Sequence, residues 1–270
     1  MDLTAVTSAL TELAYPLLVA ASVGVARAMG MILLTPAFMR LGLTGMIRSA
    51  VAFAVALPVV PAVFAGLDGT ALPSALDLAG LVMKEMAVGA VIGLLFGIPF
   101  WAAEMAGELV DLQRGSTMSQ LVDPSSAGES SVTATLFTIA LITLFFMSGG
   151  FLFLLDGFYR SYAFWPADAF LPVTGGAGAQ ALLGLLDRIM QIAVALIAPV
   201  VIVILVVDVM LAFLSRMAPQ LHVFDLSMAV KNLIQAGVMV LYLMFLAPLM
   251  FDQVMALDGL MDRMGAVFAR

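Results

Sequence analysis

The sequence contains no cysteine, and its single histidine is His222. Without cysteine the chain cannot form a disulfide, a thiolate zinc site, an iron–sulfur cluster or a cysteine nucleophile. With one histidine, a histidine-based metal centre and a Ser-His-Asp triad are nearly excluded as well. These two shortages argue against an enzyme, and they point to no cofactor.

Charge is scarce too, because Asp, Glu, Lys and Arg make up only 11% of the 270 residues. A soluble domain carries about 25% charged residues. Hydrophobic residues make up 63%, so most of the surface cannot face water, and membrane lipid is the expected surrounding. The net charge of −7 provides neither a nucleic-acid patch nor a polybasic contact with anionic lipid. The composition indicates an integral membrane protein.

Long uncharged runs indicate where the chain crosses the membrane. A helix needs about 20 mostly apolar residues to span the hydrocarbon core, and lipid requires its backbone groups to be hydrogen-bonded internally. Five such runs are 49–67, 86–103, 130–155, 189–207 and 232–251, and a sixth, 13–39, is apolar apart from Arg27. The predicted fold is therefore all-α: a polytopic membrane protein with about six long hydrophobic, kinked helices arranged as hairpins.

Prolines and connections add detail to this arrangement. Five prolines lie inside or near the spans, where each is expected to kink or break its helix: Pro58, Pro61, Pro99, Pro199 and Pro248. The long connection 156–185 is predicted to separate a four-helix part, about 1–165, from a two-helix part, about 176–270. Apolar residues then recur at three- and four-residue steps over 254–268, which predicts a C-terminal amphipathic helix.

Two spans carry small residues at every fourth position. They are Ala20, Gly24 and Ala28 on the first span, and Gly89, Gly93 and Gly97 on the third. Small residues at this spacing let two helix backbones approach closely, which favours helix association in lipid. The pattern allows packing within the chain or contact with other subunits.

A few charged residues lie within or beside the apolar runs. Arg27 is near the middle of its run, and such a group faces a bundle interior or an aqueous cavity because it is costly in lipid. Either it faces a pore or an interface, or it pairs with an acid inside the protein. Lys84, Glu85 and Asp208 stand at the ends of runs and are expected to snorkel or to cap helices.

The densest polar segment lies between the third and fourth spans, at residues 104–131. If the third helix continues, Glu104, Glu108 and Asp111 lie on one of its faces, at positions i, i+4 and i+7. Asp111 is expected to pair with Arg114 three residues later. Gly115 is a suitable residue to end the helix in the left-handed conformation.

A short stretch of small and polar residues follows this helix end. It comprises Ser116, Thr117, Met118, Ser119 and Gln120. Asp123-Pro124 then has the pattern of an N-cap followed by proline in the first turn, which restarts the chain into the fourth span. The whole segment is either an ordinary solvated loop or a mobile constriction on a water-filled route.

Residues 107–115, Gly-Glu-Leu-Val-Asp-Leu-Gln-Arg-Gly, followed by Asp123-Pro124, resemble the signature of a known family. It is the export-apparatus T protein of type III secretion, which includes injectisome SctT and flagellar FliR. Residues 148–150, 161–166 and 218–231 agree with that family as well, the last through Pro219, Gln220, Ser227 and Lys231. The Gln113-Arg114-Gly115 triplet and Trp165-Pro166 are more similar to the virulence members than to the flagellar ones.

The resemblance implies a non-enzymatic subunit of the export gate in the bacterial inner membrane. A single T copy would join R- and S-type subunits in a helical assembly, with much of the mass raised out of the bilayer. The U-type switch protein, inner rod and needle proteins, and unfolded exported substrates are the further partners implied. Residues of about 1–165 would be R-like, and about 176–270 S-like.

The resemblance also implies that a loop at about 115–123, after the Gln-Arg-Gly motif, helps to plug the closed pore. A secondary transporter for a small solute is the alternative function. It predicts a midplane site near Arg27 and Asp208 together with inverted repeats. The sequence has no repeat at a fixed period, and its polar residues are concentrated in a connection instead.

Overall fold

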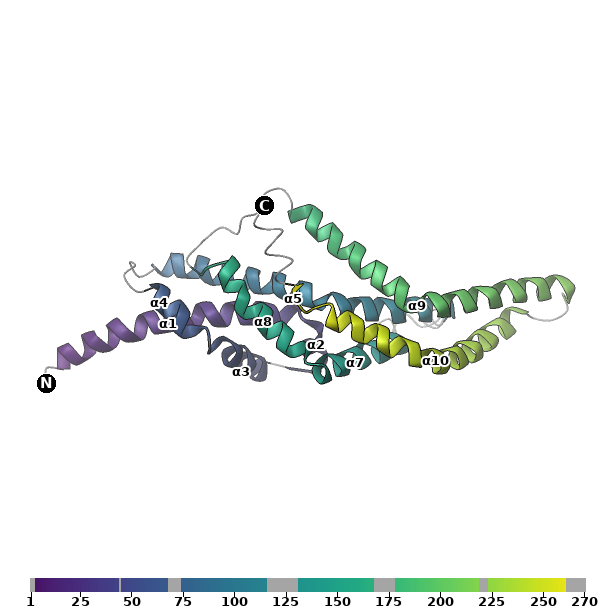
Figure 1. Cartoon of the computed structure of the whole chain (residues 1–270), viewed down its shortest axis with the longest axis horizontal. Coiled ribbons are helices and arrows are strands. Elements are labelled where there is room, and N and C mark those ends of the chain that lie inside the picture. Colours follow the sequence, from purple (N-terminus) through teal and green to yellow (C-terminus); the bar gives the residue numbers. More distant parts are fainter. Residues whose placement is uncertain are drawn as a thin grey trace. The chain divides into compact units, whose positions relative to one another are not determined.

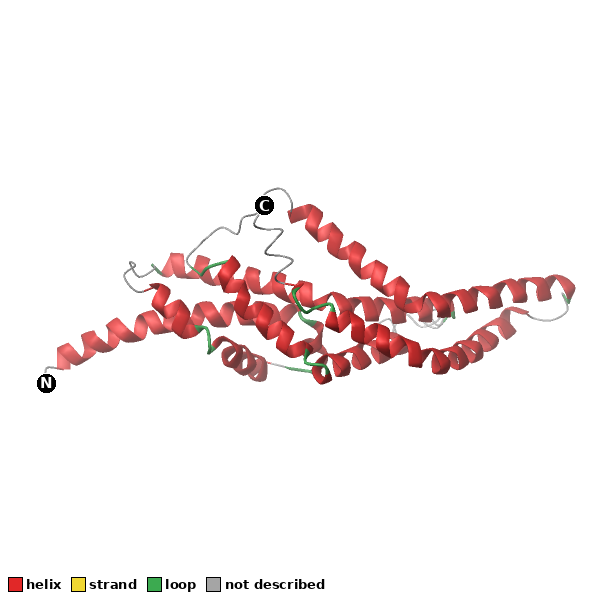
Figure 2. Cartoon of the chain, in the orientation of Figure 1, coloured by secondary structure: helices red, strands yellow, loops and turns green. Residues whose placement is uncertain are grey.

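The computed structural model describes residues 3–43, 45–67, 74–115, 131–167, 178–218 and 223–260. Throughout these ranges the regular elements are helices, as predicted (Figures 1 and 2). In chain order they are α1 (Leu3–Leu34), α2 (Pro36–Arg40), α3 (Gly45–Ala56), α4 (Val60–Leu67), α5 (Ala75–Gln113), α7 (Val132–Met147), α8 (Gly150–Phe164), α9 (Gly178–Met217) and α10 (Val223–Met255).

Four of these helices, α1, α5, α9 and α10, are each long and apolar enough to cross a membrane. The pairs α3 with α4 and α7 with α8 each provide one further span if the two helices of a pair are counted together. The described residues thus contain up to six spans. This confirms the prediction of about six long apolar helices, with two of them built from two pieces.

Prolines explain one of the two broken spans. Pro58 lies in the turn between α3 and α4, which are bent by 62° relative to each other, and Pro61 is the second residue of α4. Each proline was expected either to kink or to break its helix. Three of them do not break it and lie inside long helices: Pro99 in α5, Pro199 in α9 and Pro248 in α10. A proline removes one backbone hydrogen bond, and the neighbouring turns of a long helix retain theirs.

The other broken span lies within one uncharged run. The run 130–155 was counted as a single span, and inside it α7 ends at Met147 and α8 begins at Gly150. Gly149 has φ +82°, a left-handed conformation that terminates a helix and that glycine adopts without steric cost. Neither a charge nor a proline marks this break, and its signal in the sequence is the Ser148-Gly149-Gly150 stretch.

Gly149→Ala is expected to destabilise the protein by about 1–2 kcal/mol, because a Cβ is unfavourable in the left-handed region. Thermal unfolding of the detergent-solubilised protein measures the change. Gly237→Ala is the matched control, since Gly237 lies within α10 and a Cβ built there meets nothing within 4 Å. It should be neutral or slightly stabilising. Equal unfolding temperatures for the two variants would contradict the role of Gly149.

The chain divides into two compact units. Unit 1 comprises Met1–Gly97, Gly149–Ala181 and Leu257–Arg270, and unit 2 comprises Ile98–Ser148 and Leu182–Ala256. In unit 1, α1 packs against α3 and α4. In unit 2, α10 packs against α7. The division into R-like and S-like parts is a different one, and it remains a prediction.

Small residues bring α1 and α5 together within unit 1. A Cβ built on Gly89 would lie 2.8 Å from the carbonyl carbon of Arg27, and one built on Gly93 would lie 2.5 Å from the carbonyl oxygen of Met31. The approach is reciprocal, since a Cβ on Gly30 of α1 would lie 2.9 Å from the backbone nitrogen of Ala90. The two backbones therefore touch with no room for a side chain.

The other small residues of α1 are also internal. Ala20 and Ala28 are fully buried, and a Cβ on Gly24 would meet the Cβ of Ala56 at 3.4 Å. Gly97, the last residue of the predicted small-residue face, lies within α5 at the edge of unit 1. Of the two alternatives left open by the sequence, these contacts correspond to packing within the chain.

Candidate functional site

The C-terminal end of α5 carries a buried carboxylate in unit 2. Asp111 is 3% exposed, and its Oδ1 accepts a hydrogen bond from the Thr133 hydroxyl at 2.6 Å. Its Oδ2 accepts from the Thr133 backbone nitrogen at 3.1 Å and from the Ser131 hydroxyl. The Arg114 guanidinium pairs with Oδ1 at 2.9 Å. We call Asp111, Arg114, Ser131 and Thr133 the Asp111 cluster.

The Asp111 carboxylate accepts hydrogen bonds at the start of α7. Ser131 is the N-cap of that helix, and its hydroxyl accepts a hydrogen bond from the Ala134 nitrogen at 3.0 Å. The same hydroxyl donates to Asp111, whose charge also lies beside the positive end of the α7 dipole. A carboxylate on one helix therefore satisfies donors in the first turn of another.

The backbones of the two helices are in close contact one turn away. A Cβ built on Gly107 of α5 would lie 2.6 Å from the carbonyl carbon of Thr133. Ala106 and Val110, on the same part of α5, are fully buried. The Asp111 cluster is thus set on a tightly packed junction between α5 and α7.

The Gln113-Arg114-Gly115 motif ends α5 next to this junction. Gly115 has φ +81°, and its nitrogen donates to the carbonyl oxygen of Leu112 at 3.0 Å. The methyl group of Met228 lies 3.7 Å from where a Cβ on Gly115 would be, so the first turns of α10 lie beside the motif. Two segments that carry the family resemblance, 107–115 and 218–231, therefore meet in unit 2.

The Asp111 cluster does not include the remaining residues of the predicted site. Glu108 is exposed and Glu104 is half-buried on α5, so of the acidic face Asp111 is the member that is buried. Gln113 is exposed at the helix end. Several predicted site residues lie outside the described ranges, namely Ser116, Thr117, Met118, Ser119, Gln120, Asp123, Pro124, Pro219 and Gln220. Most of the C-terminal amphipathic segment, from 261 onward, lies outside them as well.

Two polar contacts join α9 to α10 in unit 2. Lys231 forms an ion pair with Asp208, and the Tyr242 hydroxyl donates to the carbonyl oxygen of Leu196 at 2.9 Å. Asp208 was expected to snorkel or cap its helix, and it is instead engaged by a cation of the neighbouring helix. Ser227 lies on the first turns of α10 and has a polar partner too.

Arg27 lies at the centre of a second polar cluster, in unit 1. It is fully buried, and its Nε and Nη2 donate to the Glu85 carboxylate at 2.5 and 3.0 Å. Nη1 donates to the Ser161 hydroxyl at 2.9 Å, and Nη2 also donates to the Trp165 carbonyl at 2.7 Å. The guanidinium carbon lies 3.6 Å from the centre of the Tyr162 ring, a cation–π contact. Arg27 is therefore paired internally.

Glu85 corrects an interpretation made from the sequence. It was expected to snorkel or cap, but it is fully buried and binds both Arg27 and Lys84, the latter at 2.6 Å. Lys84 also donates to the carbonyls of Pro166 and Ala167, at 2.9 and 3.1 Å. The prediction failed because α5 begins at Ala75, well before the uncharged run, so Glu85 lies inside the helix and not at its end.

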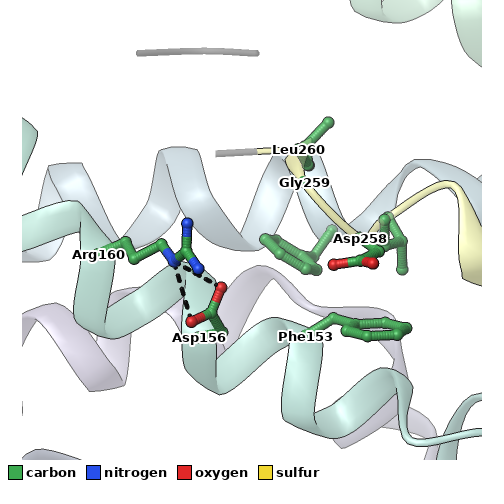
Figure 3. Close-up of a pocket in the computed structure, with 9 residues that line it drawn as sticks. Phe153, Asp156, Arg160, Asp258, Gly259 and Leu260 are labelled. Atoms are coloured by element: carbon green, nitrogen blue, oxygen red, sulfur yellow. Dashed lines mark hydrogen bonds and ion pairs between the residues drawn. The ribbon is translucent and has the colours of Figure 1, made fainter. Parts of the chain in front are cut away.

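Two cavities lined by described residues of unit 1 contain no set of reactive groups. One cavity of about 290 Å³ is lined by apolar residues and by Tyr162. The other, shown in Figure 3, holds about 10 Å³, room for one water at most. Its polar wall is the Asp156–Arg160 ion pair of α8, which faces Asp258 of the turn after α10. Across the described ranges, no three His, Cys, Asp or Glu side chains come together as metal ligands.

The range that matches a known protein family includes the residues of both clusters. A family described as "Bacterial export proteins, family 1" matches residues 18–257. "Yop proteins translocation protein T" of Yersinia pestis is 40% identical over 164 residues, which are 61% of this chain and 63% of that protein. "Secretion system apparatus protein SsaT" of Salmonella typhimurium is 30% identical over 223 residues, 80% of this chain and 84% of that protein.

A flagellar relative matches a shorter stretch. "Flagellar biosynthetic protein FliR" of Bacillus subtilis is 30% identical over 153 residues, 56% of this chain and 59% of that protein. The greater similarity to secretion proteins than to the flagellar protein confirms the branch predicted from the motifs. The chain belongs to the bacterial export proteins, family 1, the T proteins of type III secretion export apparatuses, which are multi-pass proteins of the bacterial inner membrane.

Proposed function

We propose that this protein is a component of the inner-membrane export gate of a type III protein secretion system. One copy assembles with R- and S-type subunits, and the gate works with the U-type switch protein and the inner rod and needle proteins. Unfolded export substrates pass through the pore to which it contributes. The observation that carries this proposal is the family match over residues 18–257, which includes both the Asp111 and Arg27 clusters.

The exposed faces of α9 and α10 support an assembly. Only 22% of the most apolar part of α10 and 39% of that of α9 is buried within the chain. Large apolar side chains project from α10 with exposures above two thirds: Leu233, Val240, Leu241, Met244 and Phe245. Such faces require lipid or other subunits to cover them.

The closed pore is plugged, in this proposal, by the loop at about 115–123. Support comes from the Asp111 cluster, because it lies at the end of α5, directly before residues 116–123 in the sequence, and joins that end to the start of α7. The transporter alternative gains nothing from the structure. Arg27 and Asp208, which were to form its site, are each engaged by a partner in the same unit, Glu85 and Lys231 respectively.

Co-expression tests the assembly. The protein is tagged and purified from detergent after expression together with the R- and S-type genes of its own cluster. We expect both partners to co-purify in a stable complex, and to be absent when the tag is placed on an unrelated membrane protein. A homogeneous, stable monomer that retains neither partner would overturn the proposal.

Deleting residues 116–120 is expected to make resting cells leaky to ions and small molecules. Gly115 is retained because its left-handed conformation ends α5. Leakage is measured as dye or ion uptake in cells in which the complex has been shown to assemble. Replacement of residues 116–120 by five Gly and Ser residues is the control for loop length. Wild-type permeability of an assembled deletion variant would show that this loop is not a seal.

A further inference from the structure

We propose that Asp111 is a positioning residue that clasps the end of α5 to the start of α7. The clasp fixes the separation of Gly115, which follows the end of α5, and Ser131, which is the N-cap of α7. This inference rests on the proposed function in one respect: the segment joined to those points contains the proposed plug. The clasp itself consists only of described residues.

Chain connectivity alone does not hold these two points together. Residues 115 and 131 are separated by a stretch that would span about 50 Å if extended. Their proximity therefore depends on contacts, and Asp111 makes them from α5 to Ser131 and Thr133. One carboxylate thus connects the helix end before the segment to the helix start after it.

The clasp depends on a single ionised side chain. Loss of its charge leaves the Ser131 hydroxyl and both Thr133 donors without a full acceptor, and leaves Arg114 without its counter-charge. Hydrogen bonds to a charged acceptor are roughly twice as strong as neutral ones. Asparagine at position 111 keeps the shape but presents an amide group to a site in which every neighbour is a donor.

The two helices are nevertheless expected to stay packed in such a variant. Gly107 holds the backbones of α5 and α7 in contact independently of the carboxylate. Asp111→Asn should therefore release the helix termini without unfolding unit 2. This separates a positioning role from a general contribution to stability.

Because the chain lacks cysteine, introduced cysteines allow specific spin labelling. Labels are placed at Gln113 and Val132, both exposed residues on either side of the clasp, in the assembled complex. We expect a narrow distance distribution in the parent and a distribution at least twice as wide after Asp111→Asn. Thr133→Val should give an intermediate width, whereas Thr133→Ser, which keeps the hydroxyl, should restore the parent width.

Glu108→Gln is the matched control, since it removes an exposed acid from the same helix three residues earlier. It should leave the distance distribution unchanged. In resting cells, Asp111→Asn is expected to produce at least half of the leakage seen when residues 116–120 are deleted. If Asp111→Asn prevents assembly, Thr133→Val decides the question, because it removes one hydrogen bond and no charge.

The outcomes separate the clasp from the plug. A parent-like distance distribution in both Asp111→Asn and Thr133→Val would overturn the clasp, whatever the deletion does. A leaky deletion variant together with an Asp111→Asn variant that has parent-like permeability and a parent-like distance distribution would also overturn it, while leaving the plug in place. A wider distance distribution in Asp111→Asn, combined with wild-type permeability of the deletion variant, would support the clasp and refute the plug.

Discussion

Glu85→Gln is expected to destabilise the protein by about 3–5 kcal/mol, the cost of leaving a buried charge without its partner. Glu85 is fully buried and neutralises two cations: Arg27, which is fully buried as well, and Lys84, whose side chain is 8% exposed. The change is measured as the loss of unfolding free energy in detergent and as a drop in the amount of protein found in the membrane. It is among the largest effects that a single substitution in this chain should have.

An exposed ion pair supplies the control for this prediction. Asp156 and Arg160 pair across one turn of α8 with half of each side chain exposed, so Asp156→Asn should cost less than about 1 kcal/mol. The double variant Arg27→Met with Glu85→Leu removes the main charges together and should recover part of the loss. A Glu85→Gln variant as stable as Asp156→Asn would contradict the buried pair.

Gly89→Val is expected to cost at least about 3 kcal/mol, at the upper end of overpacking effects. The added atoms would meet backbone, namely the carbonyl carbon of Arg27 at 2.8 Å and the nitrogen of Met31 at 3.0 Å. Backbone cannot move aside as the end of a flexible side chain does. Separating α1 from α5 would also draw the Arg27 guanidinium away from Glu85, so the two losses are coupled.

Gly184→Val is the matched control for Gly89→Val, because a Cβ at Gly184 in α9 meets nothing within 4 Å. Both variants place a β-branched residue in a helix, so the difference in their unfolding temperatures isolates the interhelical contact. A difference of less than a few degrees would show that α1 and α5 are not in backbone contact at Gly89.

The apolar helices were predictable from the sequence because lipid imposes a simple requirement. Each span must hold about 20 apolar residues and must satisfy its own backbone, so charges mark its limits. The break at Gly149 was not predictable in this way. A left-handed residue satisfies the same hydrogen-bonding requirement through a helix cap, and the surrounding residues remain apolar.

The polar contacts were predictable only where they are local. Asp111 and Arg114 are three residues apart on one helix, so their pairing followed from helix geometry. The contacts of Asp111 with Ser131 and Thr133, and that of Arg27 with Glu85, join residues of different helices. They depend on the rotation and register of each helix, which no pattern within one helix determines. The family signature located residues 107–115 without revealing what Asp111 binds.

The pairing of Arg27 with Glu85 also has a consequence for biosynthesis. The two residues are 58 positions apart, so α1 leaves the ribosome well before Glu85, the counter-ion of Arg27. An arginine at the centre of a helix costs about 2.5–3.5 kcal/mol on the insertion scale of the translocon. Until α5 is also inserted, the apolar residues of α1 must offset the insertion cost of Arg27, or α1 must remain beside the translocon. Correct insertion of the first span is therefore completed by a helix synthesised later, which makes topogenesis of this end of the protein a cooperative event.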